Sequence, residues 1–509
     1  MIYVFQVQID PAYQPPELLH ALVKVEAKAL ICAEKYKSNN CYDMVQTLIP
    51  ELNKSAEGGI EITSSKLPAL KTLIVMSNAQ HRGAYRLKDI ILSASEEYIQ
   101  EVNQLQTLIQ PDDGCTVQFS SGTTGSPKAA LLSHHALVNN GYFIKTLINK
   151  DRKGVKVCVL TQFCHSSGSF HGIICNLLFG YTVVLPAPTF DAKKTLEAIT
   201  QERCTDLFGT PSMYVDLINT SQDLNLKVTT LQVAGCGGAP CSQQLALQIK
   251  QTLNVRHLRQ GYGMTEVSGV FFSTLNDTLE QVTTTVGCLV DHCEVKVVDR
   301  EGRMVPMGTP GELWVRGYNV MLGYFNDEEK TREFIRPDGW AKTGDQFVLQ
   351  EDGYARIVGR MKDVIIRIGL KIFPSEIEEF FETHPDIMEA QVFGVPDPKV
   401  GEEICVYLRL REGVTITEQD VVDFCKDKDW LKNKVYNSNP RTEDLKENTR
   451  SRSALMEAKI ALVQLLSCFN LKVVPKTPIP IKISKSGLVM TVDGGFWLGL
   501  QQRVKNAAK

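Results

Sequence analysis

The sequence predicts an α/β protein, with a large N-terminal domain of α/β subdomains plus a β-rich subdomain, followed by a small α+β C-terminal domain. Three observations support this fold class. Helical and strand-like patterns alternate over the first half of the chain, which is typical of sheets covered by helices. Short β segments separated by Gly and Pro turns dominate between Val286 and Val358, and a strand followed by a helix begins after Arg360. A chain of 509 residues is also too long for one compact core.

The α/β pattern begins close to the N-terminus. Apolar residues recur at helical spacing from Pro15 onward, and the apolar run from Ala29 to Cys32 predicts a strand. Further strands are expected at Leu70 to Val75, Thr116 to Phe119 and Val155 to Leu160. The strand at Thr116 leads into a Gly-rich turn.

Beyond Arg360 the sequence passes from a charged turn through a short strand into a helix that begins near Pro374 or Ser375. After Lys426 a polar run with little periodicity has the composition of a linker. We therefore expect an N-terminal domain over residues 1–360, part of a C-terminal domain over 361–427, and a linker over 428–452 that precedes a tail over 453–509.

Composition excludes several classes of protein. A net charge of −3 without a basic stripe argues against nucleic-acid binding. The 14 Cys residues include no C-x-x-C pair, so we expect buried thiols in a reducing compartment rather than a zinc site or a disulfide scaffold. The most apolar stretch, Gly172 to Pro188, is interrupted by polar residues and falls short of the roughly 20 residues that span a bilayer.

A phosphate-binding loop is predicted directly after the strand at Thr116. Hydroxyls and unhindered Gly N–H groups can surround a polyphosphate, and a Lys adds a point charge; the alternative is a plain surface turn. A Pro before the Lys distinguishes the loop from a Walker A motif. Its residues are Ser120, Ser121, Gly122, Thr123, Thr124, Gly125, Ser126, Pro127 and Lys128.

This loop resembles the phosphate-binding signature of the adenylate-forming superfamily, which includes acyl-CoA synthetases. The segment Gly261 to Glu266 is similar to the second signature of that superfamily. The resemblance implies that Tyr262 stacks on adenine, that Gly263 belongs to the cofactor-binding residues, that Thr265 contacts phosphate, and that Glu266 helps to hold Mg²⁺. Magnesium prefers one or two carboxylates together with phosphate oxygens and water, whereas an isolated Glu is usually a solvated surface acid.

Other matches follow in the order of the family. Gly238 and Ala239, within Gly237 to Pro240, resemble the small residues beside adenine and the acyl chain. By the same resemblance, Asp345 accepts hydrogen bonds from the ribose hydroxyls and Arg360 contacts ribose and phosphate. Each motif alone is weak, because an Asp or Arg in a Gly-containing turn is usually solvated.

Two further residues take their expected roles from the resemblance. His165 matches a His that lines the acyl-carboxylate site, although a single His is more often structural. Lys362 matches the hinge about which a small, mobile C-terminal domain turns between two half-reactions. Those reactions form an acyl-AMP from ATP and a fatty acid, and then an acyl-CoA.

Within the superfamily the chain is similar to the mitochondrial medium-chain acyl-CoA synthetases of the family member 2 group. The similarity covers roughly residues 3–427 and includes the segments Asp10 to Gln14, Phe208 to Met213 and Val320 to Tyr324. It implies ATP, Mg²⁺ and CoA as cofactors, a medium-chain fatty acid as substrate and a mitochondrial location. The family has about a hundred further residues before Asp10, so we expect a truncated start with no visible targeting peptide.

The C-terminal domain is expected to be incomplete. The family's G-K turn, whose Lys reaches the acyl carboxylate during adenylation, is not found, and Lys476 and Lys485 are weak candidates for this Lys. The tail resembles the C-terminal end of an insect haem-thiolate monooxygenase without the Cys that holds haem, which suggests fused gene fragments. An adenylation-impaired ligase, a nucleotide- or acyl-binding pseudoenzyme and, least supported, a haem monooxygenase are the alternatives.

Overall fold

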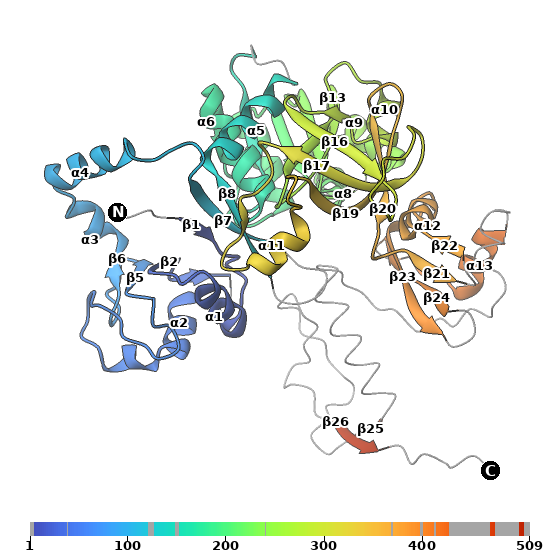
Figure 1. The fold of residues 1–509 in the computed structure, drawn as a ribbon. Helices are drawn as coiled ribbons and strands as arrows, with labels where there is room; N and C mark the ends of the chain where they lie inside the picture. Colours follow the sequence, from blue (N-terminus) through green and yellow to red (C-terminus); the bar gives the residue numbers. More distant parts are fainter. Residues whose placement is uncertain are drawn as a thin grey trace. The chain divides into compact units, whose positions relative to one another are not determined.

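The computed structural model describes residues 5–37, 39–120, 127–147, 152–239, 241–367, 370–397, 401–411, 414–426, 469–473 and 498–502 (Figure 1). Backbone contacts divide the described residues into two units. The first takes in those up to Pro385 and those of Gln391–Val406, and the second takes in those of Asp386–Ala390 and those from Tyr407 onward.

The chain begins with a small α/β layer. Helix α1 (Pro15–Lys24) starts at a Pro, and Gln14 and Glu17 form a reciprocal capping box around its first turn. Strand β2 (Ala29–Ala33) follows and pairs in parallel with β5 (Thr72–Met76), which pairs with β6 (Tyr85–Arg86). The expected helix and the first two strands are confirmed, although the helix ends at Lys24 and β5 is shifted by two residues at its start.

A four-stranded sheet in the order β1-β7-β8-β18 joins distant parts of the chain. Strand β7 (Gly114–Ser120) lies between β1 (Gln6–Gln8) and β8 (Lys128–Ser133), and β8 pairs with β18 (Gly323–Tyr324). The strand predicted at Thr116 to Phe119 is therefore confirmed as the centre of β7. The sheet places β8, which directly follows the predicted phosphate loop, beside β18 from a distant part of the chain, as the register of Leu131 with Gly323 shows.

The largest sheet has seven strands in the order β10-β9-β11-β12-β13-β14-β15. The first five run parallel, and β14 and β15 are antiparallel to their neighbours. Their bounds are β9 Lys156–Val159, β10 Thr182–Val184, β11 Asp206–Gly209, β12 Val233–Gly237, β13 His257–Met264, β14 Ser268–Phe272 and β15 Cys288–Leu289.

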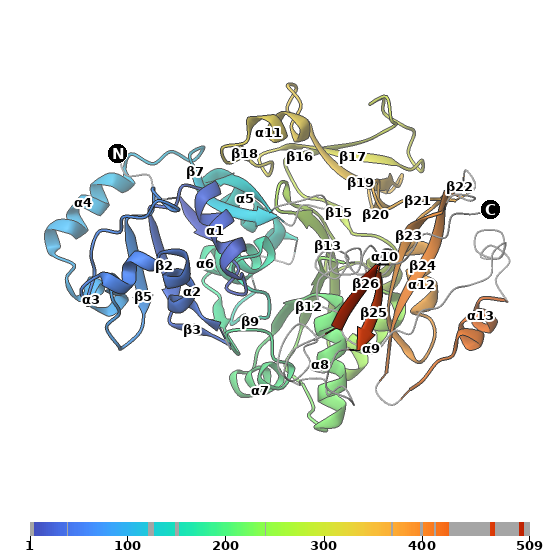
Figure 2. The same cartoon turned by 90° about the horizontal axis from the view of Figure 1, so that it is seen from below.

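Three helices cover one face of this sheet (Figure 2). They are α7 (Ala192–Glu202), α8 (Pro211–Asp223) and α9 (Gln243–Thr252), and their apolar sides bury Leu196, Tyr214 and Ile249 in the largest core cluster. Helix α5 (His134–Thr146) packs against β14. Other elements of this part of the chain are β3 Lys35–Tyr36, β4 Asn39–Asn40, α2 Cys41–Leu48, α3 Leu87–Leu92, α4 Glu96–Gln106, α6 Cys175–Phe179 and α10 Leu279–Thr284, together with a 3-10 helix at Pro50–Lys54 and a π-helix at Gly168–Ile174.

The predicted β-rich subdomain is an antiparallel sheet in the order β16-β17-β19-β20. Its strands are β16 Cys293–Val298, β17 Gly311–Gly317, β19 Ala341–Leu349 and β20 Ala355–Arg360, and helix α11 covers Glu328–Phe334. Phe347 and Leu313 of this sheet are fully buried against Phe271 of β14. The core of the subdomain is thus continuous with the seven-stranded sheet.

The residues after Arg360 form a sheet in the order β22-β21-β24-β23. Its strands are β21 Ile365–Arg367, β22 Leu370–Ile372, β23 Ile387–Asp397 and β24 Gly401–Leu410, with helices α12 Pro374–Phe381 and α13 Glu418–Lys426. Helix α12 begins at the predicted Pro374. The predicted linker over 428–452 lies outside the described residues, and of the tail only β25 (Phe469–Val473) and β26 (Leu498–Gln502) are described. No helix among the described residues is both long and apolar enough to cross a membrane.

Candidate active site

The predicted phosphate loop joins two adjacent antiparallel strands. Ser120, the last residue of β7, pairs directly with Lys128, the first residue of β8. The residues between them that the sequence assigns to phosphate binding, Ser121, Gly122, Thr123, Thr124, Gly125 and Ser126, lie outside the described residues. The hairpin therefore fixes both ends of the loop.

Glu266 lies in the turn after β13 and is only 4% exposed. Its Oε1 accepts a hydrogen bond of 2.7 Å from the hydroxyl of Ser120 and one of 2.9 Å from the phenol of Tyr324. The ammonium of Lys128 lies 5.0 Å from the centre of the Tyr324 ring, within the range of a cation–π contact. Two residues of the phosphate loop and the predicted magnesium ligand thus meet around Tyr324.

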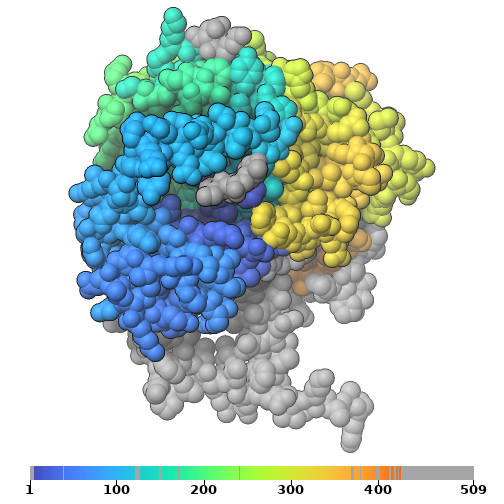
Figure 3. All heavy atoms as spheres, turned by 60° about the vertical axis from the view of Figure 1, so that its left-hand side comes forward, coloured from blue at the N-terminus to red at the C-terminus, as the bar shows by residue number. Residues whose placement is uncertain are grey.

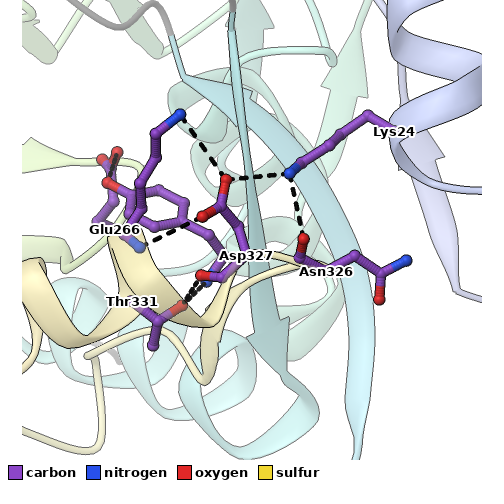
Figure 4. A network of polar contacts seen from close by, with 7 residues as sticks. Lys24, Glu266, Asn326, Asp327 and Thr331 are labelled. Carbon is purple, nitrogen blue, oxygen red and sulfur yellow. Dashed lines mark hydrogen bonds and ion pairs between the residues drawn. The ribbon is translucent and has the colours of Figure 1, made fainter.

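A polar network holds the segment that carries Tyr324 (Figure 4). Asp327 caps helix α11, and its carboxylate lies 3.0 Å from the ammonium of Lys24 on α1. The hydroxyl of Thr331 accepts a hydrogen bond from the backbone N–H of Tyr324 at 2.8 Å. The space-filling view shows the blue N-terminal residues next to the yellow residues near 330, as this ion pair requires (Figure 3). A contact between parts of the chain 303 positions apart therefore supports the site.

A second group joins Tyr262, Asp345 and Arg360. The phenol of Tyr262 donates a 2.6 Å hydrogen bond to Asp345, and the guanidinium of Arg360 lies 3.6 Å from the other oxygen of that carboxylate. Burial raises the pKa of Asp345, while the Tyr262 hydrogen bond and the charge of Arg360 oppose this rise. Repulsion from Glu266 also raises the pKa of Asp345, so the two groups of residues share one electrostatic environment.

The small residues of the predicted site lie at the carboxyl ends of two adjacent parallel strands. Gly238 and Ala239 follow β12 and are exposed, and Gly237 pairs with Gly261 on β13. Gly263 has no room for a side chain, because an added Cβ would lie 2.2 Å from the carbonyl oxygen of Ser268. Thr265 is half-buried in the turn that follows. Ligands of open α/β sheets bind at this edge.

His165 and Lys362 are both exposed. The ligand atoms of Asp10, Cys164 and His165 all lie within 4.8 Å of one another. Burial raises the pKa of the Cys164 thiol to about 12, which keeps it neutral. Lys362 lies in the turn after β20, where the backbone N–H of Asp363 bonds to the carbonyl of Arg360. The described contacts bring neither residue to Glu266.

The residues around Glu266 suit a magnesium ion. Both hydrogen bonds to the carboxylate go to Oε1, and Oε2 accepts no hydrogen bond from the residues described. One free carboxylate oxygen beside a phosphate loop is the donor set that Mg²⁺ takes in nucleotide sites. The sequence does not identify Tyr324 as a member of this group, although Tyr324 ends the segment Val320 to Tyr324 that resembles the family.

Comparisons with known proteins agree with this geometry. The family model described as AMP-binding enzyme matches residues 1–325, and that of the AMP-binding enzyme C-terminal domain matches residues 376–436. The mitochondrial medium-chain acyl-CoA ligase of Danio rerio is 42% identical over 84% of this chain and 70% of the relative. The Homo sapiens ligase of the same name is 37% identical over 84% of this chain and 70% of its own length.

Two solved structures share the fold. ATP-bound MatB from Rhodopseudomonas palustris is 25% identical, with a TM-score of 0.68 over 82% of this chain and 76% of that chain. The anthranilate CoA ligase AuaEII in complex with anthranoyl-AMP is 21% identical, with a TM-score of 0.74 over 90% of this chain and 83% of that chain. The chain therefore belongs to the AMP-binding enzyme family, within the adenylate-forming superfamily.

Proposed function

We propose that the chain activates a carboxylic acid with ATP to form an acyl-AMP and then transfers the acyl group to CoA. The observation that carries this proposal is the meeting of Ser120, Lys128 and Glu266 around Tyr324. The names of the Danio rerio and Homo sapiens relatives as acyl-CoA ligases support the choice of reaction.

In the proposed complex, adenine lies against Tyr262 and the small residues Gly238, Ala239 and Gly263. The ribose hydroxyls donate to Asp345, and Arg360 contacts ribose and phosphate. Asp345 already accepts from Tyr262 through Oδ2, so one phenol links the adenine and ribose positions. A carboxylate that accepts two hydroxyl hydrogen bonds also orients the sugar and with it the α-phosphate.

The phosphates are proposed to lie between the loop and Glu266, with Lys128 and Thr265 as donors and Ser120 to Ser126 as the cradle. A bound Mg²⁺, held through Oε2 of Glu266, would supply positive charge to the phosphate oxygens. The hydroxyls of Ser120 and Tyr324 hold the Glu266 carboxylate in a single orientation for that contact. Positioning and charge neutralisation then supply most of the catalysis.

The chemistry requires two displacements. An oxygen of the substrate carboxylate attacks the α-phosphorus, the bond to the β-phosphate oxygen breaks, and pyrophosphate leaves. The CoA thiol then attacks the acyl carbon, loses its proton, and AMP leaves with the electron pair of the broken C–O bond. His165 is proposed to face the acyl carboxylate, and the Asp10 carboxylate beside it is a positioning group.

The finer assignments extend the same proposal. We propose a medium-chain acid as substrate and a mitochondrial location, which the names of the Danio rerio and Homo sapiens relatives support. Domain boundaries near residues 360 and 427, with a hinge at Lys362, follow from the resemblance. Lys476 and Lys485 lie outside the described residues, as does most of the monooxygenase-like tail. If neither Lys substitutes for the family's G-K residue, adenylation slows by a factor on the order of 10² to 10³.

Two assays on the full chain test the proposal. Pyrophosphate release is measured with ATP, Mg²⁺ and octanoate, and thioester formation is measured after CoA is added. Pyrophosphate release that depends on all three reagents is expected, and Lys128→Met should reduce it. Silence in both assays with retained ATP binding would instead identify a nucleotide-binding pseudoenzyme. Sequencing of long transcripts across residue 427 tests whether the tail is continuous with the ligase.

A further inference from the structure

Three side chains that can bind a metal ion meet close to the first strand of the chain. Asp10 follows β1, and Cys164 and His165 lie between β9 and the π-helix. A carboxylate oxygen, the thiol sulfur and an imidazole nitrogen all lie within 4.8 Å of one another. Because the carboxylate comes from a distant part of the chain, no local spacing of Cys and His marks this cluster in the sequence.

The buried side chain of Gln118 on β7 links the two segments that carry the cluster. Its Nε2 donates to the side-chain oxygen of Gln8 at 3.2 Å and to the hydroxyl of Ser169 at 2.6 Å. That hydroxyl donates in turn to the carbonyl of His165 at 3.1 Å. Gln118 and Ser169 are only 1% and 5% exposed. Core hydrogen bonds therefore hold the backbone near Asp10 beside that of His165, as the support around a ligand set must.

Each of the three side chains keeps an atom available to a metal ion. The thiol of Cys164 donates to the side-chain oxygen of Gln162 at 3.5 Å, so its sulfur lone pairs remain. Oδ1 of Asp10 accepts from the backbone N–H two positions further on, and Oδ2 accepts no hydrogen bond from the described residues. The imidazole of His165 is exposed and has no hydrogen bond or ion pair within the described part of the chain.

The cluster carries negative charge that no basic side chain balances. Burial, followed by the charge of Asp10, raises the pKa of Tyr13 and of the Cys164 thiol to about 12. The same two causes raise the pKa of Tyr36, whose ring lies 5.7 Å from the ammonium of Lys37. No Lys or Arg of the described residues forms an ion pair with Asp10. A positive ion beside this carboxylate would therefore be favourable.

The donor set selects the kind of ion. Mg²⁺ and Ca²⁺ take oxygen ligands, whereas a thiolate, an imidazole and a carboxylate together suit Zn²⁺. Tetrahedral zinc has bonds of about 2.0–2.3 Å, which place neighbouring ligand atoms roughly 3.3–3.8 Å apart. The three atoms would have to approach one another by roughly 1 Å, and the exposed side chain of His165 can turn to achieve this.

From these contacts we infer that Asp10, Cys164 and His165 form a Zn²⁺ site, separate from the magnesium site proposed at Glu266. On binding, the zinc–sulfur bond forms, the S–H bond breaks and the proton passes to solvent. Three protein ligands leave a fourth position for water. His165 is also proposed to face the acyl carboxylate, so bound Zn²⁺ would take its imidazole from that role.

Titration of the full, reduced chain with Co²⁺ tests the inference, because Co²⁺ reports thiolate ligation by a charge-transfer absorption band. We expect one equivalent of Co²⁺ to produce this band and Zn²⁺ to displace it. Cys164→Ser should abolish the band. His165→Ala and Asp10→Asn should each weaken Co²⁺ binding at least about tenfold, since even the loss of a partner outside the ligand set costs roughly 10- to 100-fold.

Matched variants elsewhere in the chain control for unspecific effects. Cys115→Ser removes a half-buried thiol of β7, and His135→Ala removes an exposed imidazole beside the carboxylate of Asp112. Both should retain the band and the affinity. His165 is exposed, so His165→Ala is expected to fold even if a change at Cys164 disturbs the core.

The absence of the band, its survival in Cys164→Ser, or unchanged Co²⁺ affinity in either His165→Ala or Asp10→Asn overturns the inference. Loss of the band with the thiol and weaker binding without the other two ligands support it. The titration needs neither ATP nor CoA. A failed zinc site thus leaves the ligase proposal standing, and a chain that binds zinc without releasing pyrophosphate refutes only the ligase proposal.

Discussion

The phenol of Tyr262 donates a 2.6 Å hydrogen bond to the carboxylate of Asp345, 83 positions further along the chain. This bond joins the seven-stranded sheet to the β-rich subdomain at the site. The ring of Tyr262 also packs edge-on against the ring of Phe347, with 4.6 Å between the two ring centres. Both the hydroxyl and the ring of Tyr262 are therefore held in place.

Tyr262→Phe should leave the ring packing intact and remove only this hydrogen bond. A hydrogen bond to a charged group contributes roughly 1.5–3 kcal/mol, so we expect ATP binding to weaken by about tenfold or more. Titration calorimetry with ATP measures the effect. The buried Tyr214, which donates to the carbonyl of Gly235 at 2.8 Å outside the ribose site, provides the control variant Tyr214→Phe. Equal loss of ATP affinity in both variants would contradict a specific role for Tyr262.

Asp345 should also make stability depend on pH. Burial raises its pKa above the ordinary value of 3.8. At pH values between the pKa of the unfolded state and that of the folded state, the folded chain therefore holds a proton that the unfolded chain has lost. This contribution to stability is fully present below the unfolded pKa and disappears as pH rises through the folded pKa. Urea unfolding across this acidic window should show a loss of stability in the native chain that is absent from Asp345→Asn. Parallel curves for the two proteins would exclude the effect.

Glu266→Gln should separate folding from catalysis. Glutamine keeps an oxygen that can accept from Ser120 and Tyr324, so thermal stability should change little. The negative charge proposed to hold Mg²⁺ is lost, and pyrophosphate release should fall on the order of 10²- to 10³-fold. Release is followed as a function of Mg²⁺ concentration, with Glu294→Gln, an exposed acid on β16, as control. Unaltered release in Glu266→Gln would remove this residue from the metal site.

The bidentate pair of Arg152 and Asp206 is expected to be a large single contribution to stability. Its side chains are only 14% and 7% exposed, and removal of one partner from a buried pair costs about 3–5 kcal/mol. Arg152→Met should therefore destabilise far more than Arg303→Met, whose partner Asp299 lies on the surface. Chemical denaturation of both variants measures the difference. Adding Asp206→Asn to Arg152→Met should restore part of the lost free energy of unfolding. A double variant that loses as much free energy of unfolding as the two single variants together, or more, would refute the coupling between the two residues.

Local sequence patterns predicted where several helices and strands begin, and in which order the family motifs occur. The start of α1 at Pro15 and of α12 at Pro374 follows from the preference of Pro for the first helical turn, and the predicted β-rich region is an antiparallel sheet. The partners of Glu266 could not be predicted in this way. Tyr324 lies 58 positions from it, and only the assembled sheet brings the two together.

The burial of Lys145 and Arg259 could not be predicted for a similar reason. Lys145 lies in the last turn of helix α5, and a Lys at such a position is usually solvated. Arg259 lies in β13 just before the segment Gly261 to Glu266, and the sequence around it does not indicate that it is buried. Their burial depends on how α5, β11 and β13 pack, which sequence periodicity does not describe.

Strand β13 carries Arg259 near its start and leads to Glu266 just beyond its end, and hydrogen bonds to β12 and β14 hold it on both sides. The buried start of the strand and its end beside the nucleotide site are therefore held at a fixed spacing. An exchange at the buried start of this strand therefore changes the packing beneath the site without replacing any residue assigned to the nucleotide.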